Sequence, residues 1–138
     1  MSERIFTLAE ARGLIPQVAP IIEEFVTKQR RLQTLQTIME TIQRSAASNG
    51  GSAHADTREQ ERETAELGAD LRRALQALHA LGAELKDPEQ GLLDFLALRE
   101  GRRVYLCWRR GEPTIHWWHE ISDGFAGRQH IVEGEWPD

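Results

Sequence analysis

The stretch VAPIIEEFVTKQRRLQTLQTIMETI, residues 18–42, decides the fold. Its apolar residues recur at alternating steps of three and four, which is the heptad spacing of a helix that packs along another helix. One polar residue, Lys28, interrupts this seam. The positions of the seam are Val18, Ile21, Phe25, Lys28, Leu32, Leu35, Met39 and Ile42.

A second run of residues with the same spacing follows in residues 64–85. Between the two runs lies Ser45–Asp56, SAASNGGSAHAD, whose small and turn-prone residues predict a loop. Two seams of similar length on either side of one loop predict an antiparallel helical hairpin over residues 1–82. The second seam consists of Thr64, Leu67, Leu71, Ala74, Leu78, Leu81 and Leu85.

The beginning of the chain carries helix signals of its own. Thr7 and Glu10 have the spacing of a capping box, in which each side chain accepts a hydrogen bond from the other residue's backbone amide. Gly13 and Pro16 predict the end of a short first helix, because the residue before a proline avoids helical dihedral angles. Pro16 then suits the first position of the long helix, and Pro20 predicts a bend or a later start.

The C-terminal part of the chain has a different composition. Only two aromatic residues precede Gly82, whereas seven follow it. Glycines and prolines divide residues 83–138 into short runs, at the spacing of a small antiparallel meander. The predicted fold is therefore α+β: a long helical hairpin followed by a small antiparallel sheet that packs on its base, within a single domain of 138 residues.

The clearest hairpin of this sheet joins residues 103–109 to residues 114–120. If a four-residue loop connects them, His119 lies on an apolar face that packs on the helices, and Cys107 lies on the other face, opposite His116. The predicted pairs are Trp108–Ile115, Leu106–Trp117 and Val104–His119 on the first face, and Cys107–His116, Tyr105–Trp118 and Arg103–Glu120 on the second.

Charge and cysteine content exclude several classes of protein. The chain carries 17 basic and 22 acidic residues, whereas proteins that bind nucleic acid through bulk charge are strongly basic. Cys107 is the single cysteine, which excludes an intramolecular disulfide and a zinc cluster built from cysteines alone. The N-terminus lacks the apolar core of a signal peptide, and no apolar run is long enough to span a membrane. We therefore expect a cytoplasmic protein without nucleic-acid or membrane partners.

His119 is the first candidate for chemistry. A buried imidazole needs hydrogen-bond partners, and nearby carboxylates can hold it or raise its pKa. Three roles stay open: a general acid or base, a metal ligand, and a structural residue that positions the turn into Gly124. The available carboxylates are Asp94, Glu120, Asp123 and Glu84.

Metal ligation would also involve Cys107 and His116, which the predicted register makes cross-strand neighbours. Two ligands do not complete a site, and His116 and His119 are expected on opposite faces of their strand. No cofactor is therefore predicted, although zinc or iron would suit these side chains.

Arg128 follows a flexible stretch, residues 124–127, and its planar cation can clamp a carboxylate or phosphate of a ligand. The alternative is a tight bend in which Arg128 pairs with Glu112, Asp94 or Asp123 of the same chain. The glycines follow none of the phosphate-binding motifs.

Three stretches of the chain carry a resemblance: FTLAEARGLIPQVAPII (residues 6–22), GAELKDPEQGLLDF (82–95) and VYLCWRRGEPTIHWWHEISDGFAGRQHI (104–131). They are similar to a prokaryotic family of uncharacterised proteins called domain of unknown function 2203. The resemblance implies no activity, since none is established for the family. The polar motif positions that it implies are Glu84, Lys86, Asp94, Cys107, Glu112, His119 and Arg128.

Two functional interpretations follow. The heptad seams favour a non-catalytic module that self-associates, most simply as a homodimer of hairpins. Apolar residues off the first seam support this, because Ile22, Val26 and Ile38 widen its apolar face beyond what one partner helix covers.

The alternative is a protein that binds a small anion or a metal, or an enzyme. Its site would lie around His119, Asp94 and Arg128, and the resemblance adds Glu84 and Lys86 as catalytic candidates.

Overall fold

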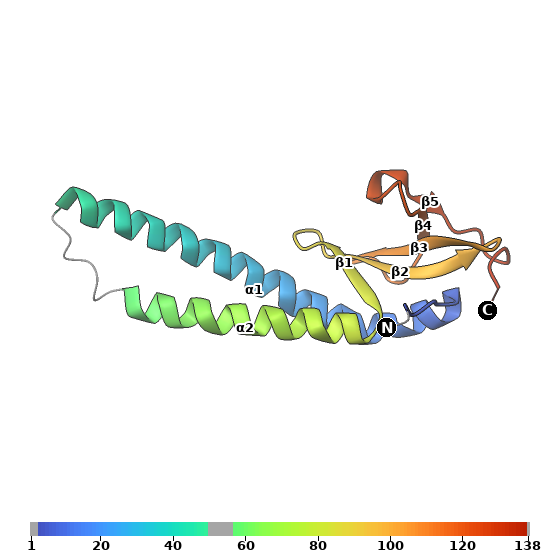
Figure 1. Ribbon diagram of the computed structural model, residues 1–138, viewed down its shortest axis with the longest axis horizontal. Coiled ribbons are helices and arrows are strands. Elements are labelled where there is room, and N and C mark those ends of the chain that lie inside the picture. The colour runs from blue at the N-terminus through green and yellow to red at the C-terminus, as the bar shows by residue number, and fades with distance from the viewer. Residues whose placement is uncertain (1–2, 50–56, 138) are drawn as a thin grey trace.

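The computed structural model describes residues 3–49 and 57–137, which form two long helices followed by a five-stranded antiparallel sheet (Figure 1). The helices pack side by side as a hairpin, and the sheet lies over the base of that hairpin. This arrangement confirms the predicted α+β fold. The elements are α1 (Leu8–Asn49), α2 (Arg58–Ala80), β1 (Ala83–Asp87), β2 (Leu92–Arg99), β3 (Arg102–Arg109), β4 (Trp117–Glu120), the 3-10 turn η2 (Phe125–Gly127) and β5 (Gln129–His130).

The predicted capping box holds the N-terminus of α1. The Thr7 backbone N–H donates to Glu10 Oε1 at 2.8 Å, and the Glu10 N–H donates to the Thr7 hydroxyl oxygen at 3.1 Å. The Glu10 amide is one of the donors that a helix start leaves without a partner inside the helix.

Helix α1 does not break after its first turns, so the predicted short helix is wrong. The helix runs through Gly13, Pro16 and Pro20 to Asn49. Both prolines lie on its exposed side, so water can satisfy the carbonyl groups of Arg12 and Pro16 that lose their amide partners. On the opposite side α1 packs against the sheet, and this packing outweighs the local cost of the prolines.

Ionic contacts join the two helices as well as apolar ones. Lys28, the polar interruption of the first seam, donates from Nζ to Asp70 Oδ2 of α2 at 2.8 Å. Further out, Arg31 binds Glu63 at 2.7 Å. The interruption of the seam is therefore a contact between the helices.

Part of the predicted loop Ser45–Asp56 is helical. Helix α1 continues through residues 45–49, because two alanines, both strong helix formers, occupy that stretch. Residues 50–56 lie outside the described residues.

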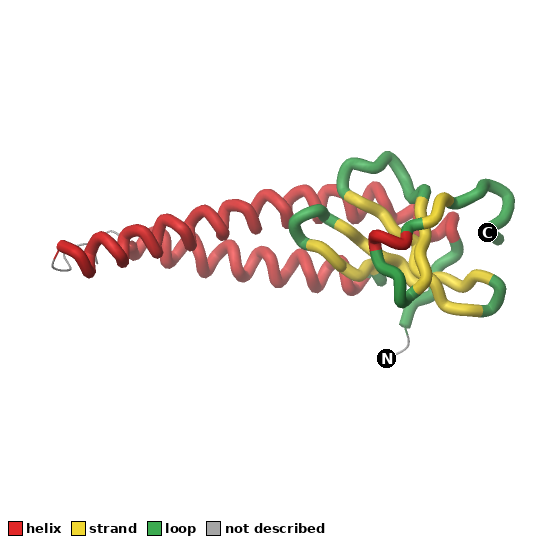
Figure 2. Tube along the Cα trace, turned by 90° about the horizontal axis from the view of Figure 1, so that it is seen from above, coloured by secondary structure: helices red, strands yellow, loops and turns green. Residues whose placement is uncertain are grey.

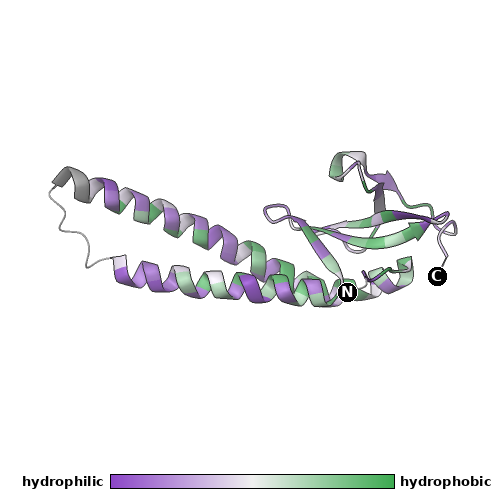
Figure 3. Ribbon diagram, in the orientation of Figure 1, coloured by the Kyte–Doolittle hydropathy of each residue, from purple (hydrophilic) through white to green (hydrophobic). Residues whose placement is uncertain are grey.

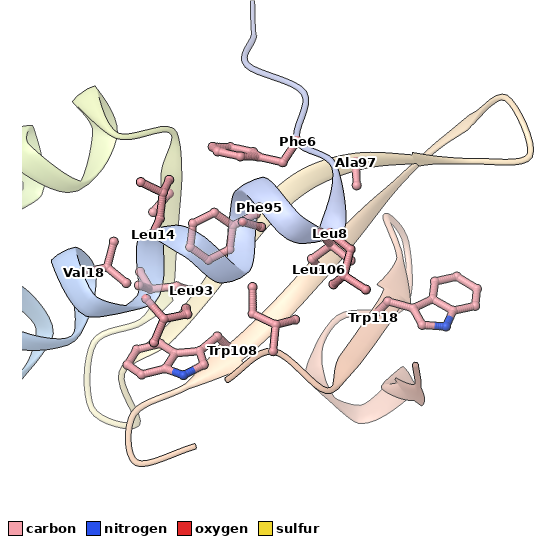
Figure 4. Close-up of a cluster of buried hydrophobic side chains, with 14 of the residues drawn as sticks. Phe6, Leu8, Leu14, Val18, Leu93, Phe95, Ala97, Leu106, Trp108 and Trp118 are labelled. Carbon is pink, nitrogen blue, oxygen red and sulfur yellow. The ribbon is translucent and has the colours of Figure 1, made fainter. Parts of the chain in front are cut away.

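Helix α1 and the sheet share one apolar core. The first turns of α1 run beneath one face of the sheet before the helix continues along α2 (Figures 1 and 2). Figure 4 shows Leu14 and Val18 of α1 beside Leu93 and Phe95 of β2, and the ring of Phe6 meets that of Phe95 edge to face at 5.4 Å. We call this face the core face. The strand residues of the buried cluster that lie on it are Ala83, Leu93, Phe95, Ala97, Val104, Leu106, Trp108 and Trp118.

The sheet is a meander in which each strand pairs with the next along the chain. Strand β4, however, pairs with β3 one residue out of the predicted register. Tyr105 lies opposite His119, and Leu106 lies opposite Trp118. Trp118 therefore points into the core, and His119 lies on the opposite face, which we call the outer face. The predicted placement of His119 beside Val104 on the core face is wrong.

The connection between β3 and β4 explains this shift. Seven residues, 110–116, separate the two strands instead of the four that were predicted. Within this segment Ile115 is fully buried, and the Trp108 indole N–H donates to the Glu112 carbonyl at 2.9 Å. The connection has an odd number of residues where an even number was predicted, and pairing starts only at Cys107–Trp117, so the faces of β4 are exchanged.

Apolar residues concentrate at the base of the hairpin, and its far half is largely polar (Figure 3). Val26 is the last α1 residue in the cluster shared with the sheet. Ile22 and Val26 are fully buried within the single chain, whereas Ile38 is 38% exposed. Neither helix of the described chain is long and apolar enough to cross a membrane.

Replacing the two neighbouring tryptophans one at a time tests the register. Trp118 is 6% exposed on the core face, whereas Trp117 is half-buried on the outer face. We expect Trp118→Ala to lower the free energy of unfolding by about 3–5 kcal/mol, the usual cost of truncating a buried aromatic side chain, and Trp117→Ala to cost clearly less. Urea denaturation followed by circular dichroism measures both losses, and a larger loss for Trp117→Ala would contradict the observed register.

Candidate functional site

The outer face of the sheet brings together three side chains that lie far apart in the sequence. Asp94 of β2 is directly opposite Cys107 of β3, and His119 of β4 joins them from the next row of residues. One ligand-type atom from each residue lies within 4.8 Å of the other two. The three residues are only 1–3% exposed. We call them the Asp–Cys–His cluster.

Both ring nitrogens of His119 have a partner. Nδ1 lies 2.7 Å from the backbone carbonyl oxygen of Glu120, which can only accept, so Nδ1 carries a hydrogen. Nε2 lies 3.0 Å from Asp94 Oδ2. A hydrogen bond between Nε2 and the carboxylate then needs a second proton, because neither bare atom can donate. The pair therefore holds one proton in a position that a metal ion can also occupy.

The surroundings of His119 and Cys107 shift their pKa values upward for different reasons. Burial lowers the pKa of His119, but hydrogen bonds with Asp94, Cys107 and the Glu120 carbonyl outweigh burial and raise it to about 10. Burial raises the pKa of the Cys107 thiol, and the nearby His119 offsets this only in part. Both shifts favour the protonated forms of His119 and Cys107 when no metal is bound.

The same residue types occur in nucleophilic catalysis, but this arrangement does not fit that chemistry. A Cys–His–Asp relay needs the carboxylate on one ring nitrogen and the thiol on the other. In His119 the Asp94 carboxylate takes Nε2 and the Glu120 carbonyl takes Nδ1. Cys107 also hydrogen-bonds with His119, but both ring nitrogens already have another partner, so neither is left to take the thiol proton alone. A nucleophilic cysteine also has a lowered pKa, whereas this thiol has a raised one.

The cluster lies in the wall of a small pocket on the outer face. The pocket has a volume of about 150 Å³, which corresponds to about five molecules of liquid water. Lys86 and Tyr105 contribute polar groups to its lining, and Ile121 and Phe125 contribute apolar ones. Leu92 and Gly124 complete the lining. The pocket is large enough for a small organic molecule.

Lys86 and Tyr105 line this pocket, and Glu84 contacts both of them without lining the pocket itself. Glu84 Oε1 accepts from the Tyr105 hydroxyl at 3.1 Å and from Lys86 Nζ at 3.0 Å. The Lys86 ammonium lies 4.7 Å from the centre of the Tyr105 ring. Sequence reasoning missed Tyr105 as a site residue, because the predicted register placed it opposite Trp118. A connection with an odd number of residues would have placed Tyr105 on the same face of the sheet as His119.

Arg128 does not join the Asp–Cys–His cluster. Its Nη2 donates to both carboxylate oxygens of Glu112, at 2.8 and 3.0 Å, which is one of the pairings that the sequence left open. Its guanidinium also lies 5.0 Å from the ring centre of Trp117 and 4.8 Å from that of Phe125. Arg128 is therefore a positioning residue that fixes the segment carrying Phe125.

His116 also lies apart from the cluster. Its ring is parallel to that of His130, with the ring centres 6.4 Å apart. Cys107 lies opposite Trp117, so the predicted cross-strand pair of Cys107 with His116 is wrong, for the same one-residue shift of register.

The raised pKa of His119 gives the stability of the metal-free protein a definite pH dependence. The folded protein holds the His119 proton more tightly than the unfolded chain, whose histidine titrates at about pH 6.5. This contribution is complete below about pH 6.5 and is lost as the pH rises toward 10.

We expect the free energy of unfolding, measured with a chelator present, to fall between about pH 7 and pH 8.5 by at most about 1.4 kcal/mol per pH unit. Asp94→Asn should flatten this slope, because the amide can donate to a neutral His119. An unchanged slope in Asp94→Asn would show that another group causes it.

Comparison with known proteins confirms the resemblance seen in the sequence. Residues 4–131 match domain of unknown function 2203, described as an uncharacterised conserved protein. No curated protein and no solved structure matches the chain. The matched range contains the whole Asp–Cys–His cluster and the rim of its pocket. The chain therefore belongs to the family called domain of unknown function 2203.

Proposed function

We propose that this protein binds one divalent transition metal ion, with zinc as the best fit, at Asp94, Cys107 and His119. The observation that carries the proposal is the fixed orientation of His119. A histidine that ligates a metal almost always donates its other ring N–H to a carbonyl or carboxylate, and the Nδ1 contact with the Glu120 carbonyl at 2.7 Å is such a contact. It leaves Nε2 directed at the Asp94 carboxylate, within the cluster.

The chemistry of the three side chains supports zinc. Thiolate, imidazole and carboxylate are the three ligand types that zinc takes in proteins. A thiolate also argues against magnesium and calcium, which prefer oxygen ligands. In a tetrahedral zinc site the nitrogen and oxygen ligands lie about 3.3 Å apart, close to the 3.0 Å between His119 Nε2 and Asp94 Oδ2.

The number of protein side chains in the cluster supports a metal site that also binds a small molecule. Structural zinc sites are closed by four protein ligands, whereas sites that act on a ligand have three and keep one position open. In the described part of the chain, three side chains form the cluster, and the pocket lies beside them. The open position would face that pocket.

Metal titration of the chelator-treated protein tests the proposal. We expect one zinc ion per chain by isothermal titration calorimetry and elemental analysis. Zinc at a hundredfold excess over its dissociation constant should raise the free energy of unfolding by about 2.7 kcal/mol. His119→Ala and Cys107→Ala should abolish both effects.

His116→Ala is the matched control, because His116 lies outside the cluster and stacks on His130. It should bind zinc as the unaltered protein does. Stoichiometric binding that survives in His119→Ala, or the absence of binding in the unaltered chain, would refute the proposed site.

A second candidate function, self-association, is favoured by a groove between α1 and α2. The groove has a volume of about 240 Å³. Lys28 on its rim pairs with Glu24 and with Asp70, and a rim that carries both charges is self-complementary for a copy related by a two-fold axis. We propose a second copy of this chain as the occupant, which would give a homodimer. The apolar lining residues are Ile21, Phe25, Leu71, Ala74 and Ala77.

Sedimentation velocity at micromolar concentration tests the dimer. We expect a dimer that Ala74→Glu converts to a monomer, because the carboxylate would be buried in the groove. Gln76→Glu, on the exposed side of α2, is the control. Circular dichroism checks that both variants remain helical. A monomer for the unaltered chain would contradict self-association.

A further inference from the structure

The pocket beside the Asp–Cys–His cluster combines a charged group with an apolar rim. Lys86 supplies the charge. Ile121 and Phe125 supply the apolar part, and these side chains are 49% and 37% exposed. Exposed apolar side chains beside a cavity with a few polar groups are typical of sites that hold a small ligand.

A bulge in β1 positions Lys86. The pairing of β1 with β2 shifts between Leu85 and Asp87, so Lys86 is the extra residue. Bulges re-aim side chains and occur often beside active sites. The Lys86 ammonium lies 3.0 Å from Glu84 Oε1, and 43% of the Lys86 side chain is exposed. The cation is therefore oriented by its partner and still accessible to an anion from solvent.

The apolar rim is preformed as well. Phe125 lies against Arg128, and Glu112 holds Arg128 by two hydrogen bonds. Gly124, just before Phe125, has φ 64°, which favours glycine and fixes a sharp turn. An apolar surface held in place without covering side chains can accept the tail of a ligand at little entropic cost.

We propose that the metal-loaded protein binds a small organic anion of the carboxylate class with a short apolar tail. The carboxylate would take the open position on the metal, beside Lys86, and the tail would lie against Ile121 and Phe125. The volume of about 150 Å³ limits the enclosed part to a short chain. This inference rests on the proposed metal site.

Cobalt-substituted protein separates the two claims. The visible absorption of protein-bound Co²⁺ reports first whether the metal binds and then whether an anion enters its coordination sphere. The probes are acetate, hexanoate and the hexyltrimethylammonium cation, and the melting temperature is recorded with each. We expect hexanoate to bind at least about tenfold more tightly than acetate, since each buried methylene contributes about fourfold. The cation should not bind.

Two pairs of variants test which pocket residue contacts the carboxylate of the anion and which contacts its apolar tail. Lys86→Met should weaken acetate and hexanoate alike, whereas Arg62→Met, at an exposed cation of α2 that does not line the pocket, should not. Phe125→Ser should remove the advantage of hexanoate over acetate. Its control is Val132→Ser, because Val132 is 52% exposed and does not line the pocket.

The outcomes are distinguishable. A Co²⁺ spectrum that none of the probes alters, together with unchanged melting temperatures, overturns the anion site and leaves the metal site standing. Hexanoate that binds no better than acetate overturns the apolar subsite. The absence of any Co²⁺ spectrum refutes the metal site, and this inference falls with it.

Discussion

Strand β2 is buried on both faces, and the rest of the structure depends on this constraint. Six consecutive residues, Leu92–Ala97, are buried. Helix α1 supplies the apolar partners of the core face, but Asp94 on the outer face is equally removed from water. A buried carboxylate needs a partner that compensates its charge. His119 is that partner, so the candidate site follows from the packing of a strand that has no solvated side.

The features of the fold that the sequence predicted are those with a local or repeated signal. The heptad seam predicted the hairpin, and the spacing of Thr7 and Glu10 predicted the helix cap. The break predicted from Pro16 and Pro20 was wrong, because the effect of a proline depends on which side of the helix faces water. Only the packing of α1 against the sheet decides that. The strand register depended on the length of one loop, and the buried Ile115 within it gave no signal that distinguished it from a strand residue.

The sequence identified several residues of the candidate site, but it did not predict how they are arranged. Asp94 and His119 were named together because a buried imidazole needs a carboxylate, a rule that holds on either face of a sheet. The predicted cross-strand partner of Cys107 was His116, whereas Cys107 lies opposite Trp117, since a shift of one residue replaces every cross-strand neighbour. Lys86 reaches the pocket through a bulge, and Arg128 acts through Glu112. Neither the bulge at Lys86 nor the contact of Arg128 with Glu112 produces a periodic pattern in the sequence, so neither could be predicted from spacing.

The hairpin extends well past the region that the sheet supports. Helix α1 continues for 23 residues after Val26, about 35 Å at the usual rise per residue. Near the end of the part of α1 that the sheet covers, Arg110 of the β3–β4 connection pairs with Glu23 at 2.6 Å. A change of about ten degrees in the angle between α1 and the sheet would displace the last turn of the helix by about 6 Å. The position of the far end of the hairpin therefore depends strongly on that angle.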